Sequence, residues 1–368
     1  MNVLHFYKTY YPDSFGGVEQ FIFELSKGLS KNGVVSNVLS LSSKIETNFE
    51  NTGNGIYKVK TNFKIASTDF SFRVIKEFKK LANEADLIHY HFPWPFMDVV
   101  HFSSNHKKPT IVTYHSDIIK QKNLLRLYKP LMNRFLKDID LITVSSPNYL
   151  KSSENLQNYK NKVEVIPFGI SNERVDRDHE KLNYWKEQLG DKFFFFVGVH
   201  RYYKGLNYLI EALAVRDIPT VIAGEGPMTS ELKALAKKLN LKNIKFIGEV
   251  SDEDKDAIFQ MSYAFIFPSH LRSESFGISL LEAAMYGKPM ISCEISTGTS
   301  FINLNHETGL VIPAENPNAI HKAMEFLWDN PQVADEMGRA AKERYFKQFT
   351  SEQMCKSYLD LYNKILSK

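Results

Sequence analysis

The chain has 368 residues, of which 43% are hydrophobic and 24% charged, as in a globular protein with sizeable cores and unlike a disordered or fibrous one. This length suits two domains of middling size. The net charge is only +4, but residues 1–170 hold 22 Lys and Arg against 15 Asp and Glu, and the rest holds 24 against 27. A basic first half suits an acidic partner, such as a phosphorylated acceptor or an anionic membrane surface, and equally a plain solvated surface; we expect no nucleic-acid partner.

The cysteines and the apolar runs limit where the protein works. Cys293 and Cys355 are too few and too far apart for a disulfide framework, which fits a reducing compartment. No apolar run approaches the roughly 18–20 residues that a membrane-spanning helix needs. We therefore expect a cytoplasmic protein. Residues 118–137 mix leucines with basic residues, so they could lie on the inner face of the cell membrane or form a core-facing helix with a basic outer side.

The first half alternates short apolar strands with helices. Strands are expected at Val3–Tyr7, Asn37–Leu41, Leu87–His91, Thr110–Tyr114, Leu141–Val144 and Val163–Ile166. Such non-alternating strands predict a parallel sheet covered by helices on both faces. This half closes at Gly169, and the polar residues 171–192 are interpreted as a hinge.

The same pattern then restarts. Further strands are expected at Phe193–Val199, Thr220–Ala223, Ile244–Ile247, Ala264–Phe267, Met290–Ser292 and Gly309–Ile312. The two arrays predict an α/β protein with two Rossmann-like domains, whose ligands bind at the carboxyl ends of the strands. The last segment, Ser351–Leu366, has the apolar spacing of an amphipathic helix.

The stretch Ser269–Ala284 carries the most specific signal. It is a polar loop between an apolar strand and a helix, with Glu274 before the helix and Glu282 within it. The first amides of a helix have no intrahelical partner and attract anionic groups. The spacing alone is weak, because Glu307 and Glu315 share it. The strand–loop–helix context is what favours Glu274 and Glu282.

Three other strand ends hold candidate residues. Arg201 and Lys204 follow the first strand of the second half, where a cation pair can neutralise the charge of a diphosphate leaving group. Gly16 and Gly17 stand between the first strand and the first helix, where glycine allows close backbone approach. His115 follows the strand Thr110–Tyr114, whereas His89 and His91 are interpreted as structural.

In this order the motifs resemble those of the retaining, nucleotide-sugar-dependent glycosyltransferases of family 4, including their E-x7-E motif. The resemblance implies the GT-B fold: two Rossmann-like domains facing across a cleft, with a terminal helix that crosses back to the first domain. Residues 1–169 and the helix 351–368 would form the acceptor-side domain, and residues 170–350 the donor-binding domain.

The resemblance also implies roles for single residues. Glu274, His115, Lys204 and Arg201 would be the catalytic set. The donor would further contact Gly16, Gly17, the backbone at Val250, the amides around Phe276, Gly277 and Ile278, and Glu282 at the ribose. One departure stands out: Val199 occupies the position where the family usually has arginine, so Arg201 must replace it.

The predicted function is transfer of a hexosyl group, with mannosyl favoured, from a nucleoside-diphosphate sugar to a glycan or lipid-linked acceptor in cell-surface polysaccharide synthesis. GDP-mannose is the favoured donor, and a UDP-sugar stays open. No cofactor and no metal are expected, since Asp176-Arg177-Asp178 lies in the polar segment and follows no buried strand. The alternatives are a nucleotide-sugar epimerase of the same fold, a phosphorylase, and a catalytically silent nucleotide-sugar-binding partner of another transferase.

Overall fold

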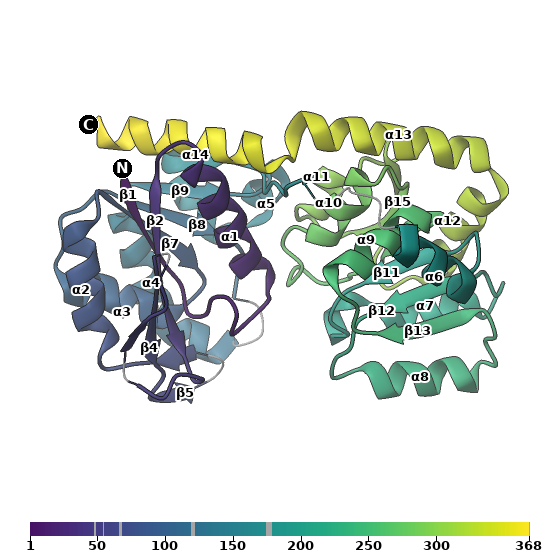
Figure 1. Ribbon diagram of the computed structural model, residues 1–368, viewed down its shortest axis with the longest axis horizontal. Coiled ribbons are helices and arrows are strands. Elements are labelled where there is room, and N and C mark those ends of the chain that lie inside the picture. The colour runs from purple at the N-terminus through teal and green to yellow at the C-terminus, as the bar shows by residue number, and fades with distance from the viewer. Residues whose placement is uncertain (48, 54, 66–67, 119–121, 174–178, 368) are drawn as a thin grey trace. The chain divides into compact units, whose positions relative to one another are not determined.

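The computed structural model describes residues 1–47, 49–53, 55–65, 68–118, 122–173 and 179–367 (Figure 1). The chain forms two compact units, the first made of Met1–Gly169 with Ser351–Lys368 and the second of Ile170–Thr350. Among the described residues, no helix is both long and apolar enough to cross a bilayer. Asp176-Arg177-Asp178 lies outside the described residues.

The first unit is built on an eight-stranded sheet of order β10-β9-β8-β7-β1-β2-β4-β3. Its strands are β1 (Asn2–Phe6), β2 (Val35–Ser42), β3 (Phe49–Asn51), β4 (Ile56–Lys60), β7 (Leu87–Phe92), β8 (Thr110–Tyr114), β9 (Leu141–Val144) and β10 (Val163–Val165). All neighbours pair in parallel except β3 and β4 at the edge. A separate hairpin joins β5 (Phe63–Ile65) to β6 (Thr68–Phe70).

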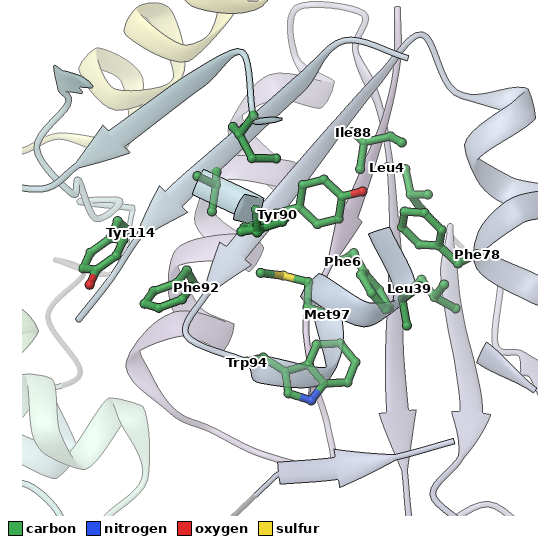
Figure 2. Packing of buried hydrophobic residues seen from close by; sticks show 14 of the residues in the cluster. Leu4, Phe6, Leu39, Phe78, Ile88, Tyr90, Phe92, Trp94, Met97 and Tyr114 are labelled. Atoms are coloured by element: carbon green, nitrogen blue, oxygen red, sulfur yellow. The ribbon is translucent and has the colours of Figure 1, made fainter. Parts of the chain in front are cut away.

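Helices cover this sheet. They are α1 (Gly17–Ser30), α2 (Val74–Glu84), α3 (Pro95–Ser104), α4 (Lys122–Asp138), α5 (Pro147–Ser152), the 3-10 helix Glu154–Lys162 and α14 (Ser351–Leu366). The core is dense in aromatic rings (Figure 2), with Phe6 lying 4.8 Å from Phe78 and 4.9 Å from Trp94 between ring centroids. Burial of these large rings stabilises the unit.

The last helix, α14, belongs to the first unit although the second unit precedes it in the chain. It packs beside α1, where the Tyr358 ring lies 5.7 Å from that of Phe21. Tyr358, Leu361, Tyr362 and Ile365 are all buried, as the predicted amphipathic pattern requires. The return of this helix was expected from the family resemblance alone.

The second unit holds a fully parallel sheet of order β13-β12-β11-β14-β15-β16. Its strands are β11 (Phe194–Val197), β12 (Thr220–Ala223), β13 (Ile244–Gly248), β14 (Ala264–Phe267), β15 (Met290–Glu294) and β16 (Gly309–Pro313). Its helices are α6 (His179–Leu189), the 3-10 turn Tyr202–Lys204, α7 (Leu206–Leu213), α8 (Thr229–Lys238), α9 (Asp252–Met261), α10 (Ile278–Met285), α11 (Thr299–Ile302), α12 (Pro317–Asp329) and α13 (Pro331–Gln348).

The structure differs from the sequence expectation in both units. The strands β3, β4, β5 and β6 were not expected, because they are short and hold polar residues. Of these, β3 is the edge strand of the large sheet, and β4 lies between β2 and β3. The sheet of the first unit is therefore mixed at one edge and not wholly parallel. Residues 179–189 form the helix α6, although the polar composition of 171–192 had been interpreted as a hinge.

Candidate functional site

In the second unit, the loops after β11 and β14 lie against each other. These strands are neighbours in the sheet, so both loops leave from the same edge. The contact is close at Gly205, where an added Cβ would meet the carbonyl oxygen of Pro268 at 2.1 Å. Gly205 also has a φ of +68°, so a side chain here would be excluded twice. The backbone of His270 further donates to the carbonyl of Tyr203 at 3.0 Å.

This loop contact brings Lys204 to Glu274. Lys204 Nζ donates to Glu274 Oε2 at 2.6 Å, and both side chains are largely buried. Ser269 Oγ lies 3.5 Å from the same carboxylate oxygen. A charge-assisted pair of this length in a partly desolvated place is much stronger than an ion pair on an open surface. Two of the predicted site residues, 70 positions apart, thus form one polar centre.

The loop that holds Glu274 leads into α10 through Gly277. Its φ is +96°, and an added Cβ would lie 3.0 Å from Leu280 Cδ1, so this turn requires glycine. The Phe276 side chain is buried, and Gly298 packs on it so tightly that a Cβ there would come within 2.3 Å of the ring. The side chain of Phe276 therefore anchors the turn, so Phe276 can offer only its backbone to a ligand.

Glu282 lies in the second turn of α10 and is only 9% exposed. Its Oε1 accepts a 2.7 Å ion pair from Lys255 Nζ on α9, and Lys255 also pairs with Asp252 at 3.0 Å. Burial alone would lower the pKa of Lys255, but the charges of Glu282 and Asp252 raise it above its ordinary value. Sequence reasoning missed Lys255, because a single lysine behind an acidic helix start gives no spacing signal.

The remaining predicted residues of this unit lie near the same edge. Arg201 is exposed at the start of the 3-10 turn that ends in Lys204, and it has no ion pair with any residue that the structure describes. The side chain of Val199, two residues earlier, is 50% exposed. Val250 is half-buried directly after β13, beside the N-cap Ser251 of α9. Ser251 caps the acidic start of α9, since its Oγ accepts from the amide of Asp254.

In the first unit, Gly16 is the N-cap of α1, and Gly17 is its first residue. Gly16 has an extended backbone with a φ of −92°, so its conformation does not itself demand glycine. A Cβ would, however, lie 2.5 Å from Glu19 Oε2, and Thr9 Oγ1 donates to the other oxygen of that carboxylate. The backbone at Gly16 is thus closely approached by a side chain, and that side chain is Glu19 of the same helix start.

His115 follows β8 and sits at the end of a row of imidazoles. Its Nε2 lies 3.2 Å from His91 Nδ1, and His91 Nε2 lies 3.2 Å from His5 Nδ1. The Phe21 ring of α1 packs edge-on against His115 at 5.0 Å. Burial lowers the pKa of both His5 and His115 to about 3, so these rings are neutral at physiological pH.

The predicted structural role of His89 agrees with its contacts. Its Nδ1 lies 2.7 Å from the Tyr362 hydroxyl of α14, and its Nε2 lies 2.7 Å from Thr113 Oγ1. The rings of His5, His89 and His91 are close enough to suggest a metal site. However, both nitrogens of His89 are already hydrogen-bonded, and its ring is stacked on His91 at 28° between planes. Stacked rings cannot direct their in-plane lone pairs at one ion, so this cluster fits a hydrogen-bond network better.

Comparison with known proteins places this geometry in a family. Residues 15–174 match the model of Glycosyltransferase Family 4, and residues 178–344 match that of Glycosyl transferases group 1. The chain is 52% identical over 353 residues to the D-rhamnosyltransferase WbpZ of Pseudomonas aeruginosa, covering 95% of this chain and 93% of that protein. The chain is a family 4 glycosyltransferase. The family resemblance expected from its motifs is thereby confirmed.

A second relative supports the family assignment, and a solved structure shows the same fold. The O-antigen chain mannosyltransferase C of Escherichia coli is 46% identical over 369 residues, which cover 100% of this chain and 99% of that protein. The sucrose-phosphate synthase of Thermosynechococcus elongatus has the same fold, with a TM-score of 0.81 at 18% identity over 100% and 99% of the two chains. The predicted GT-B fold is confirmed. The glycosyltransferase transfers a hexosyl group from a nucleotide sugar to a glycan acceptor.

Proposed function

We propose that Ile170–Thr350 binds the nucleotide sugar around the Lys204–Glu274 pair, and that the first unit presents the acceptor. The pair carries this proposal. An ammonium group held beside a carboxylate, at the edge where α10 begins, offers a cation to a diphosphate and an anion to a sugar. The amides of Gly277, the N-cap of α10, and of Ile278, its first residue, would add hydrogen bonds to the same diphosphate.

Each predicted site residue then has a definite role. Lys204 and Arg201 stabilise the negative charge that develops on the leaving diphosphate. Glu274 is released from Lys204 by the phosphate and turns to the donor sugar. Glu282 accepts hydrogen bonds from the ribose, and the backbone at Val250 contacts the base. In the first unit, Gly16 and Gly17 approach the phosphate, and the neutral ring of His115 contacts the sugar.

The donor proposed is GDP-mannose or a closely related GDP-hexose. Two relatives at 52% and 46% identity are named a D-rhamnosyltransferase and a mannosyltransferase. Rhamnose is 6-deoxymannose, so the two sugars in these names have the same arrangement of hydroxyl groups at C2, C3 and C4. We infer that the product keeps the anomeric configuration of the donor.

The acceptor proposed is a lipid-linked glycan of a cell-surface polysaccharide, reached at the membrane surface. The helix α4 supports this idea. Its inner side buries Met132 and Phe135, whereas Leu127 is 81% exposed between Arg126 and Lys129, which are exposed as well. Exposed leucine beside basic side chains suits an anionic lipid surface.

We further propose that transfer needs no metal ion. The cations at Lys204 and Arg201 would take over the neutralisation of the diphosphate that Mg²⁺ or Mn²⁺ provides in other transferases. This role explains why Arg201 is exposed, because a phosphate would be its partner. It also gives a simple experimental condition, since EDTA should leave the rate unchanged.

A thermal-shift panel of GDP-mannose, UDP-glucose and ADP-glucose, each with EDTA, tests the donor proposal. A ligand that binds only the native state raises the melting temperature, with about 2.7 kcal/mol of stabilisation at a hundredfold excess over Kd. We expect GDP-mannose to give the largest shift and Lys204→Met to abolish it. A larger shift with UDP-glucose, or no shift without a divalent metal, would overturn the donor or the metal-free site respectively.

A further inference from the structure

The contact between Lys255 and Glu282 links two helices at the same edge of the sheet. The helix α9 follows β13, and α10 follows β14, so both begin at the carboxyl ends of parallel strands. Lys255 is in the first turn of α9, and Glu282 is the fifth residue of α10. Their 2.7 Å ion pair joins the segment expected at the nucleobase to the helix expected at the phosphate and ribose.

The ammonium group of Lys255 is held from two sides. Glu282 Oε1 accepts at 2.7 Å and Asp252 Oδ1 at 3.0 Å, and the Lys255 side chain is only 16% exposed. A lysine with one partner on an open surface samples many rotamers, whereas two anchors and burial fix this one. The carboxylate of Glu282 is thereby fixed as well.

Only one oxygen of Glu282 is used in this contact. Within the described part of the chain, its Oε2 has no ion pair. A carboxylate that is held through Oε1 can present Oε2 in a constant direction to a hydroxyl donor.

We propose that Lys255 is a positioning residue that sets the preference for ribose, by holding Glu282 so that its free oxygen accepts from a ribose hydroxyl. The inference rests on the proposed function, because it takes Glu282 as the ribose contact. The inference adds Lys255, a residue outside the expected motif. It also adds a property that depends on Lys255, the discrimination of ribose from deoxyribose.

The test compares the Kd of GDP with the Kd values of 2′-deoxy-GDP and 3′-deoxy-GDP by calorimetry. UDP and its deoxy forms replace them if UDP gives the larger thermal shift. The wild-type protein should bind the ribonucleotide about tenfold or more tightly than at least one deoxy form, the effect of losing one hydrogen bond to a charged group. Lys255→Met should lower the affinity for the ribonucleotide by a similar factor and leave that deoxy form nearly unchanged. Lys255→Arg should keep most of the discrimination.

Lys181→Met is the matched control. Lys181 of α6 pairs at 2.9 Å with Asp254, which lies on the same helix, α9, as Lys255. It should leave the ratio of affinities unchanged. If Lys255→Met does not fold, Lys255→Gln replaces it, because glutamine keeps a donor without the charge.

Failure of this inference and failure of the proposed function give different results. If Lys255→Met lowers the affinity for the ribo and deoxy ligands equally, Lys255 has a merely structural role and the inference is overturned. Glu282→Ala removes the acceptor and should lose the discrimination by itself. If Glu282→Ala keeps the discrimination, the ribose role of Glu282 in the proposed function is wrong. If Lys255→Met keeps the discrimination and the Glu282 variant loses it, the proposed function stands and the positioning role of Lys255 fails.

Discussion

The two units place polar side chains at equivalent sheet edges but stabilise them in opposite ways. In the first unit, His5, His91 and His115 are neutral rings joined by 3.2 Å contacts, and burial keeps the pKa of His115 at about 3. In the second unit, Lys204–Glu274 and Lys255–Glu282 are charged pairs of 2.6 and 2.7 Å. Neutral groups cost less to bury, whereas paired charges can be exchanged for a charged ligand. The contrast agrees with the proposal that the second unit binds the charged donor and the first unit presents the acceptor.

The largest effect is expected when the paired charges are broken at Lys204. Lys204→Met removes the cation from the diphosphate and leaves Glu274 without its 2.6 Å partner. We expect kcat to fall by about 10²- to 10³-fold, the usual cost of removing one group that stabilises developing charge. Steady-state release of nucleoside diphosphate measures this. An unchanged kcat with wild-type folding would contradict a donor site at this pair.

Arg201 should have a smaller effect, because it is exposed. Arg201→Ala is expected to weaken donor binding about tenfold, as one charge-assisted hydrogen bond is lost. The double variant Arg201→Ala with Val199→Arg should recover part of that loss, since it restores arginine at the position usual for the family. Donor Kd values by calorimetry decide the point. No recovery would mean that position 199 does not point to the phosphate in this chain.

The neutral histidines of the first unit predict how stability changes with pH. The pKa of His5 is lowered to about 3 in the native state, so the unfolded chain, with an ordinary value of 6.5, binds the proton first. Its contribution is complete above pH 6.5 and is lost as the pH falls toward 3, by about 1.4 kcal/mol per pH unit.

His5→Asn tests this contribution. The variant should flatten the fall of the unfolding free energy between pH 6 and pH 4 by roughly that amount. Urea unfolding at a series of pH values measures it. His306→Asn, at an exposed position, is the control and should keep the wild-type slope. If His5→Asn also keeps that slope, the imidazole is not neutral and buried as described.

The smallest effect concerns the outer side of α4. Leu127→Gln should lower binding to anionic lipid vesicles by a few-fold and change the unfolding free energy by less than about 0.5 kcal/mol, because the side chain is exposed. Co-sedimentation with vesicles measures the binding. Val215→Gln replaces an exposed apolar residue of the second unit and should have no effect. Equal binding of all three proteins would argue against membrane contact through α4.

Much of the fold could be predicted from the sequence, because buried parallel strands are short apolar runs. All four residues of β14, Ala264–Phe267, are apolar, and the strand lies where the sequence indicated it. The edge strand β3, Phe49–Asn51, could not be found in this way, since an edge strand buries little. The helix α6 was missed for a related reason: its polar residues hide the helical period.

The site could be predicted only in part. The strand–loop–helix pattern pointed to Glu274 and Glu282, and the cation pair after the first strand of the second half pointed to Lys204. The structure adds that Lys204 and Glu274 touch. The partner of Glu282 was not predictable, because Lys255 lies on another helix and an ion pair across helices leaves no spacing in the sequence. The row of imidazoles from His5 to His115 could not be predicted from the sequence either, since three separate strands bring these rings together.

The central claim, that Glu274 acts at the donor sugar beside Lys204, is tested most directly by donor turnover in EDTA. The assay follows release of GDP from GDP-mannose, with and without lipid-linked oligosaccharide acceptors. We predict acceptor-dependent release by the wild-type protein and by Glu307→Ala, a variant of the other glutamate pair with the same spacing. Glu274→Ala should lose this release by about 10²-fold or more. Undiminished release by Glu274→Ala would contradict the account.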